Sequence, residues 1–257
     1  MSNANLYALL ESGFPADRSA VAIQTPKKSY SWDGIDRLSA QYANLLASFD
    51  LEAGARIAVQ VEKSPEALML YLAALRAGLV YLPLNTAYRE AEVAYFLGDA
   101  EPSVVVCTPG SLPWMQTLAS EAGGARVLTL GEDGNGSLPT LAQSQSGSFA
   151  TVVSGKDELA TILYTSGTTG RSKGAMLSHG NLAANAQTLN EYWGWRSDDV
   201  LLHMLPIFHV HGLFVASHGA LLAGAKTIWL PKFQVEDVLR YLPECTVMMG
   251  VPTYYVR

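Results

Sequence analysis

Short runs of β-branched and aliphatic residues alternate with longer helical patterns along most of the chain. Residues 56–61 form one such run. A helix is then predicted to start at Ser64-Pro65-Glu66, because serine can cap a helix, proline fits its first turn and glutamate carries a charge that suits the helix dipole. Gly78 is expected to end that helix. Further strands are predicted at 79–84, 104–107 and 127–130, and helices at 88–97 and 112–122.

The same alternation continues after a polar interval. Residues 131–157 contain GEDGNGS and QSQSGSF, which are small and polar without periodicity, so we interpret them as a linker or long surface loop. Beyond it we predict strands at 159–164, 175–177, 200–205, 226–230 and 246–251, and helices at 181–193, 212–222 and 235–242. The pattern predicts an α/β fold of mostly parallel sheets, with a first sheet region at 1–130 and a second, incomplete at its carboxyl end, at 158–257.

Composition and charge narrow the possible partners. Of the 257 residues, 49% are hydrophobic, which is enough for a sizeable core. The chain has 17 Lys and Arg and 23 Asp and Glu, so its net charge is −6. Because a negatively charged surface repels phosphate backbones, no nucleic acid partner is expected. Any bound anion must therefore be held by a local site.

The chain shows no membrane or export signal. Its longest apolar stretch, 67–84, is interrupted by Arg76, Gly78 and Pro83, so no stable membrane insertion is expected. The amino terminus lacks a basic start followed by an apolar run, which predicts a cytoplasmic protein. Cys107 and Cys245 lie in apolar runs without metal-ligand spacing and are interpreted as buried thiols.

The segment YTSGTTGRSKG, at 164–174, is the strongest candidate for phosphate binding. From Thr165 to Ser172 it carries five hydroxyls, which donate to phosphate oxygens, and its glycines let successive backbone N–H groups point at one anion. Lys173 adds a compact positive charge. The segment is not a Walker A loop, because GK[ST] is absent and a strand is predicted to follow it. The candidate nucleotide-binding residues are Thr165, Ser166, Gly167, Thr168, Thr169, Gly170 and Lys173.

The alternative for this segment is a flexible Ser/Gly linker or a simple hairpin turn. Apolar strands on both sides, and an arginine and a lysine at its end, argue against that interpretation.

TSGTTGRSKG resembles the signature loop of the adenylate-forming superfamily of acyl-CoA synthetases, adenylation domains and luciferases. Further similar segments follow in family order, namely ALRAG at 74–78, YLPLN at 81–85, SHGNL at 178–182, LPIFHVHG at 205–212 and GVPT at 250–253. The resemblance covers nearly the whole chain and implies the N-terminal part of the large domain. Because the later adenine loop, ribose-binding aspartate, hinge and catalytic lysine are absent, this fragment alone is expected to be inactive.

The resemblance also implies a reaction. Residues 166–170 and Lys173 would handle the β- and γ-phosphates of ATP, with the hydroxyl of Thr168 near Mg²⁺. The family joins a carboxylate to the α-phosphate, which gives acyl-AMP and pyrophosphate, and the thiol of coenzyme A then displaces AMP. Adenylation is needed because a carboxylate has no usable leaving group, whereas AMP can depart with its charge neutralised.

All five histidines fall between residues 179 and 218. His209 and His211 could present two imidazoles to a zinc ion, but no HExxH or cysteine cluster completes such a hydrolase site. His203 and His218 are expected to be structural. By resemblance, His209 lines the acyl pocket, where an imidazole can bind a carboxylate or gate entry. His211 is expected to play at most a supporting role.

The string LPIFHVHGL is most similar to malonyl-CoA and methylmalonyl-CoA synthetases, whose substrates carry a second carboxylate that His209 could pair with. An arginine that grips this group cannot be assigned, although Arg257 lies close to the expected region. The alternatives are a medium-chain, fatty or aryl acid–CoA ligase and, in another class, a non-catalytic nucleotide- or acyl-binding module. Oligomeric state is not predicted.

Overall fold

The computed structural model describes residues 3–165 and 172–256 as a mixed α/β fold. Its strands, in chain order, are β1 (Val21–Gln24), β2 (Ser29–Ser31), β3 (Arg56–Gln60), β4 (Val80–Pro83), β5 (Val104–Cys107), β6 (Arg126–Thr129), β7 (Leu159–Thr165), β8 (Lys173–Ser178), β9 (Val200–His203), β10 (Lys226–Trp229) and β11 (Val247–Met248).

The helices lie between and around these strands. They are α1 (Leu6–Ser12), α2 (Trp32–Ala47), α3 (Pro65–Arg76), α4 (Glu90–Ala100), α5 (Leu112–Glu121), α6 (Ser137–Ala142), α7 (His179–Trp193), α8 (His218–Ala223), α9 (Val235–Tyr241) and α10 (Pro252–Tyr255), with a π-helix, η2 (His211–Ser217), and short 3₁₀ turns η1 (Pro109–Ser111) and η3 (Leu242–Glu244). Within the described ranges, no helix has the length and apolar character that crossing a membrane requires.

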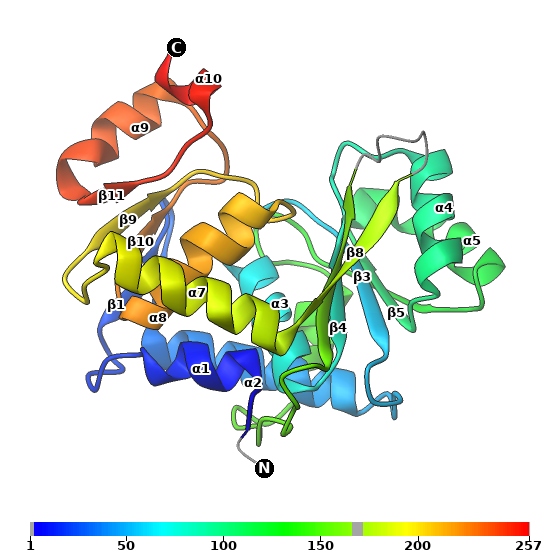
Figure 1. The fold of residues 1–257 in the computed structure, drawn as a ribbon. Helices are drawn as coiled ribbons and strands as arrows, with labels where there is room; N and C mark the ends of the chain where they lie inside the picture. Colours follow the sequence, from blue (N-terminus) through cyan, green and yellow to red (C-terminus); the bar gives the residue numbers. More distant parts are fainter. Residues whose placement is uncertain (1–2, 166–171, 257) are drawn as a thin grey trace.

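Two mostly parallel sheets organise the molecule, as predicted. One has six strands in the order β6-β5-β3-β4-β7-β8, and the other has five in the order β11-β9-β10-β1-β2. Antiparallel pairing occurs where β2 joins β1 and where β8 joins β7, both at a sheet edge. The two sheets form the two sides of the molecule in Figure 1, with α3 between them.

The sheets do not divide at the polar interval 131–157. Strands β7 and β8 extend the sheet of β3–β6, through the pair Tyr81 and Thr161, whereas β10 joins β1 through Ile23 and Thr227. The sheet regions predicted at 1–130 and 158–257 therefore do not correspond to the two sheets. The reason is that periodicity reveals each strand but not its partner, and these partners lie far apart in the chain.

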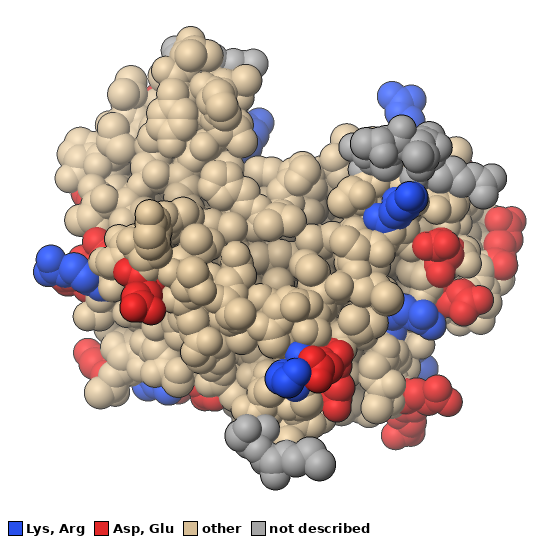
Figure 2. Space-filling view, viewed as in Figure 1, with Lys and Arg blue, Asp and Glu red and all other residues tan. Residues whose placement is uncertain are grey.

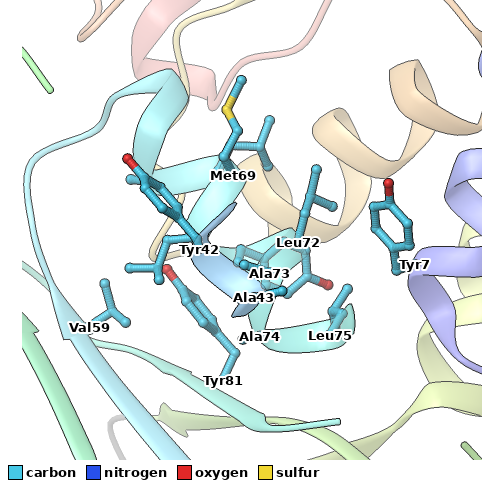
Figure 3. Close-up of a cluster of buried hydrophobic side chains, with 14 of the residues drawn as sticks. Tyr7, Tyr42, Ala43, Val59, Met69, Leu72, Ala73, Ala74, Leu75 and Tyr81 are labelled. Atoms are coloured by element: carbon cyan, nitrogen blue, oxygen red, sulfur yellow. The ribbon is translucent and has the colours of Figure 1, made fainter. Parts of the chain in front are cut away.

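Helix α3 is the centre of the core. The Ser64 hydroxyl caps it by accepting from the Ala67 amide at 3.1 Å, and Gly78 takes a φ of +68° just beyond its end. All 12 of its residues are buried, because helices and sheets pack around it. Figure 3 shows its side chains packed beside Tyr42 of α2 and Tyr81 of β4. The predicted helix boundaries are confirmed here.

Several predicted elements differ in detail. The interval 131–157, interpreted as a linker or loop, contains the helix α6, and the strand predicted at 246–251 is only β11. The strand predicted at 200–205 ends at His203, because the chain leaves the sheet before Pro206, which has no N–H to donate to a ladder. The helix predicted at 212–222 is divided into η2 and α8. Cys107 is buried, as expected, and Cys245 is half-buried; burial raises the pKa of both thiols to about 11.

Candidate functional site

The β7–β8 hairpin carries both ends of the candidate phosphate loop. Thr165 ends β7 and Lys173 begins β8, and the two are direct partners across the antiparallel ladder. Both side chains are exposed. Five of the candidate residues, Ser166, Gly167, Thr168, Thr169 and Gly170, lie outside the described residues. The fold therefore places a hydroxyl and an ammonium group on the two strands that flank the loop.

Helix α4 fixes both legs of this hairpin. The ring of Tyr164 packs on Phe96 with centroids 4.4 Å apart, and its hydroxyl donates to Asp99. Burial, followed by the Asp99 hydrogen bond, raises the pKa of Tyr164, so the phenol keeps its proton at neutral pH. On the other leg, the Tyr95 hydroxyl donates to the Ser172 carbonyl at 2.9 Å. Thr165 and Lys173 are thus each one residue from an anchored position.

The histidine-containing loop follows β9 in the other sheet. His209 is exposed, and its ring lies 5.0 Å from that of Phe208. The Leu213 amide donates to the His209 carbonyl at 3.0 Å, which ties the loop to η2. A cavity of about 230 Å³ lies against Pro206 and Phe208 of this loop.

His211, half-buried at the start of η2, lines a larger cavity of about 520 Å³. The other lining residues are Trp193, Trp195, Asp199, Val247, Met248, Met249, Gly250 and Tyr255. Sequence reasoning gave His211 only a supporting role. No local signal marks its place here, because the cavity joins side chains from α7 to α10.

The molecular surface is hollowed between the part over α9 and α10 and the part over α4, with few charged side chains in the hollow on this face (Figure 2).

The three remaining histidines are buried and hydrogen-bonded. His179 Nδ1 accepts from the Leu6 amide at 3.0 Å, and His218 Nε2 lies 2.9 Å from the Tyr71 hydroxyl. His203 Nε2 contacts the Gly212 carbonyl at 3.0 Å. Burial lowers the pKa of all three, that of His218 to about 3. The buried positions of His203 and His218 agree with the structural role expected for them.

The zinc hydrolase hypothesis gains no support from the geometry. The part of the chain that the structure describes includes all five histidines, and it holds no group of three or more His, Cys, Asp or Glu placed to bind a metal ion. The magnesium role of Thr168 lies outside the described residues.

A buried lysine beneath the histidine loop escaped the sequence analysis. Lys63 is only 8% exposed, and its Nζ donates to the carbonyls of His203 at 2.9 Å and Leu230 at 2.7 Å. Its partners are 140 and 167 positions away, so nothing in the local sequence marks it.

Comparison with known proteins identifies relatives of this chain. A malonate–CoA ligase of Arabidopsis thaliana is 32% identical over 97% of this chain. A feruloyl-CoA synthase of an Amycolatopsis species is 30% identical over 92%. Among solved structures, ATP-bound MatB from Rhodopseudomonas palustris is 51% identical over the whole chain and superposes with a TM-score of 0.96.

The matches cover only part of these relatives. The chain spans 45% of the Arabidopsis ligase, 46% of the feruloyl-CoA synthase and 51% of MatB. The family model described as AMP-binding enzyme matches residues 12–257, which include both the hairpin and the histidine loop. The resemblance drawn from the signature loop is therefore confirmed, and the chain belongs to the AMP-binding enzyme family.

Proposed function

We propose that this chain forms the N-terminal, phosphate-binding half of an AMP-forming acid–CoA ligase whose acid is malonate or methylmalonate. The observation that carries the proposal is the similarity to MatB, which extends over the whole chain at 51% identity. That similarity supports ATP binding, and the malonate–CoA ligase relative supports the substrate class, a small carboxylic acid.

In this proposal the triphosphate of ATP binds between the two legs of the β7–β8 hairpin. The Thr165 hydroxyl can donate to a phosphate oxygen, and Lys173 supplies a charge-assisted contact. The anchors on α4 hold both residues before the nucleotide arrives, which reduces the entropy lost on binding. The hydroxyl and ammonium groups of this donor set fit a polyphosphate. Mg²⁺, when bound, would neutralise phosphate charge, and Thr168 is the residue proposed to lie near it.

The chemistry is carboxyl activation in two steps. A carboxylate oxygen of the acid attacks the α-phosphorus of ATP, and pyrophosphate leaves with the electron pair of the broken P–O bond. The coenzyme A thiolate then attacks the acyl carbon, and AMP leaves as the thioester forms. We propose that His209 meets the acid, either by donating to its distal carboxylate or by gating entry.

Two other functions remain as outcomes of the test. The feruloyl-CoA synthase relative favours an aryl acid, and medium-chain or fatty acids belong to the same alternative. A non-catalytic nucleotide- or acyl-binding module would keep the hairpin without the reaction.

The test is a chimera in which this chain replaces the half of MatB that it matches. Carboxylate-dependent ATP–pyrophosphate exchange is measured with malonate, methylmalonate, acetate, octanoate and an aryl acid. The proposal predicts exchange with malonate or methylmalonate well above the others. Exchange with another acid alone would overturn the substrate assignment. No exchange with any acid, from a folded chimera, would favour the binding module.

A further inference from the structure

Lys63 joins the two sheets through an unusual set of contacts. It lies just after β3 of the six-stranded sheet, yet both carbonyls that it binds belong to the five-stranded sheet. The His203 carbonyl is the last of β9, and the Leu230 carbonyl directly follows β10. The ammonium nitrogen also lies 4.6 Å from the centroid of the Trp229 ring. One buried side chain therefore holds the carboxyl ends of two neighbouring strands.

This lysine has no acidic partner in the described part of the chain. Removing an ammonium group from water without a counter-ion is costly, and burial lowers the pKa of Lys63. The two carbonyls and the face of Trp229 offset that cost. Because these stabilising contacts need the carbonyls of His203 and Leu230 in place, Lys63 constrains where the chain leaves β9 and β10.

The His203 side chain closes the same loop from its other end. Its Nε2 lies 3.0 Å from both the Gly212 carbonyl and the Ser217 hydroxyl, and that hydroxyl donates to the same carbonyl at 2.9 Å. Burial lowers the pKa of His203, so the imidazole is neutral, and the tautomer with a proton on Nε2 satisfies the carbonyl. The loop between His203 and Gly212 is thus bridged at its base.

The base of the loop is also closely packed. A Cβ added to Gly212 would lie 2.2 Å from the Pro206 carbonyl oxygen, so the beginning and end of the loop approach within a distance that only glycine allows. The residues between these points include His209, and His211 lies next to Gly212. A shift of His203 would therefore be transmitted to both imidazoles.

We propose that Lys63 and His203 are positioning residues that hold the 204–212 loop and thereby set the orientation of His209 and His211. The inference that this loop helps to recognise the acid rests on the proposed function. The inference that Lys63 and His203 hold the loop does not. We call the contacts of Lys63 with the His203 and Leu230 carbonyls, together with the contact between His203 and Gly212, the clamp. The clamp lies within the described residues.

The first test measures amide hydrogen exchange in the 257-residue chain. The reporter is the Leu213 amide, which donates to the His209 carbonyl, and the reference is the amide of buried Val105 in β5. Lys63→Met should raise exchange at Leu213 about tenfold relative to Val105, because a charge-assisted tie is lost. Lys63→Arg, which can donate to both carbonyls and stack on Trp229, should restore most of the protection.

The matched control is Lys232→Met. Lys63 and Lys232 both line the cavity of about 230 Å³, but Lys232 is exposed. Its exchange pattern should equal that of the parent chain. Equal increases at Leu213 in Lys63→Met and Lys232→Met would overturn the clamp, as would a Lys63→Met chain whose Leu213 and Val105 amides change together.

Ser217→Ala keeps the inference testable if Lys63→Met does not fold. This variant removes one of the two donors at the Gly212 carbonyl and should raise Leu213 exchange about threefold relative to Val105. Unchanged exchange in Ser217→Ala would contradict a bridge at the base of the loop.

The MatB chimera tests what the clamp does. Lys63→Met should raise KM for malonate about tenfold, while KM for ATP stays within about twofold, because the hairpin that flanks the phosphate loop is held by α4 instead. Parallel increases in both KM values would overturn the positioning role. A parent chimera without activity would refute the proposed function, whereas the exchange results decide the clamp independently.

Discussion

The two candidate loops of this molecule are held in opposite ways. The β7–β8 hairpin lies at a sheet edge with much of β8 exposed, and it is anchored by aromatic and hydroxyl contacts to α4. The 204–212 loop instead depends on two buried polar groups: Lys63, which joins the two sheets, and His203, which bridges the base of the loop. An exposed binding group can be replaced without disturbing the core, whereas a buried polar tie supports fold and site together.

The largest effect is expected at Arg76, where removing a buried polar group is compared with removing an exposed one. Its guanidinium, at the end of α3, pairs with Asp36 at 2.6 Å and donates to the Tyr7 hydroxyl at 3.0 Å. Arg76→Met should lower the free energy of unfolding by about 3 kcal/mol, because the Tyr7 and Ser39 hydroxyls lose a charged donor inside the core, whereas water can reach Asp36, which is 37% exposed. Denaturant unfolding measures the loss. The matched control is Arg196→Met, whose ion pair with Asp198 is exposed to solvent and should contribute little to stability. Similar losses in both variants would remove the distinction.

Acid should reveal the burial of His218. Burial lowers the pKa of His218 to about 3, so between about pH 6.5 and 3 the unfolded chain takes up a proton that the folded chain resists. The stability present above pH 6.5 should therefore fall as pH is lowered through this window, by about 1 kcal/mol per pH unit from this residue. His218→Gln should flatten the pH dependence of unfolding in this window. A slope unaltered by His218→Gln would contradict the assignment.

Lys173 should affect nucleotide handling without affecting stability. In the MatB chimera, Lys173→Ala should slow ATP–pyrophosphate exchange. The free energy of phosphate binding should become less favourable by about 1.5–3 kcal/mol, because one charge-assisted contact is lost. The free energy of unfolding of the chain should change by less than about 0.5 kcal/mol, since the side chain is exposed. Lys156→Ala, at another exposed lysine, is the control. Unchanged ATP dependence in Lys173→Ala would exclude Lys173 from the phosphate site.

The smallest expected effect concerns the choice of acid. His209→Ala in the chimera should reduce kcat/KM for malonate by about 1 kcal/mol more than for acetate, if the imidazole meets the distal carboxylate. Equal reductions for the two acids would make His209 a gate and not a specificity residue.

Local patterns predicted a good part of this fold. The cap at Ser64, the turn at Gly78 and the limits of β5 depend on neighbouring residues, and all three are confirmed. The order of strands in the sheets was not predictable, because the partner of a parallel strand lies a whole crossover or more away. The elements of the first 55 residues, α1, β1, β2 and α2, were not predicted at all, although β1 lies inside a sheet.

The candidate site divides in the same way. Five hydroxyls, glycines and a lysine in one short segment indicate phosphate binding without any knowledge of the fold, so Thr165 and Lys173 could be chosen from sequence. Lys63 and the cavity position of His211 arise only when distant elements meet. Neither has a periodicity or motif that reports it.

The first half-reaction is the most direct test of the proposed adenylation. The MatB chimera is incubated with ATP, Mg²⁺ and malonate in the absence of coenzyme A, and the phosphate products are identified. We expect pyrophosphate and malonyl-AMP, followed by AMP and the thioester when coenzyme A is added. Formation of ADP and phosphate, or no malonate-dependent product from a folded chimera, would contradict adenylation by this site.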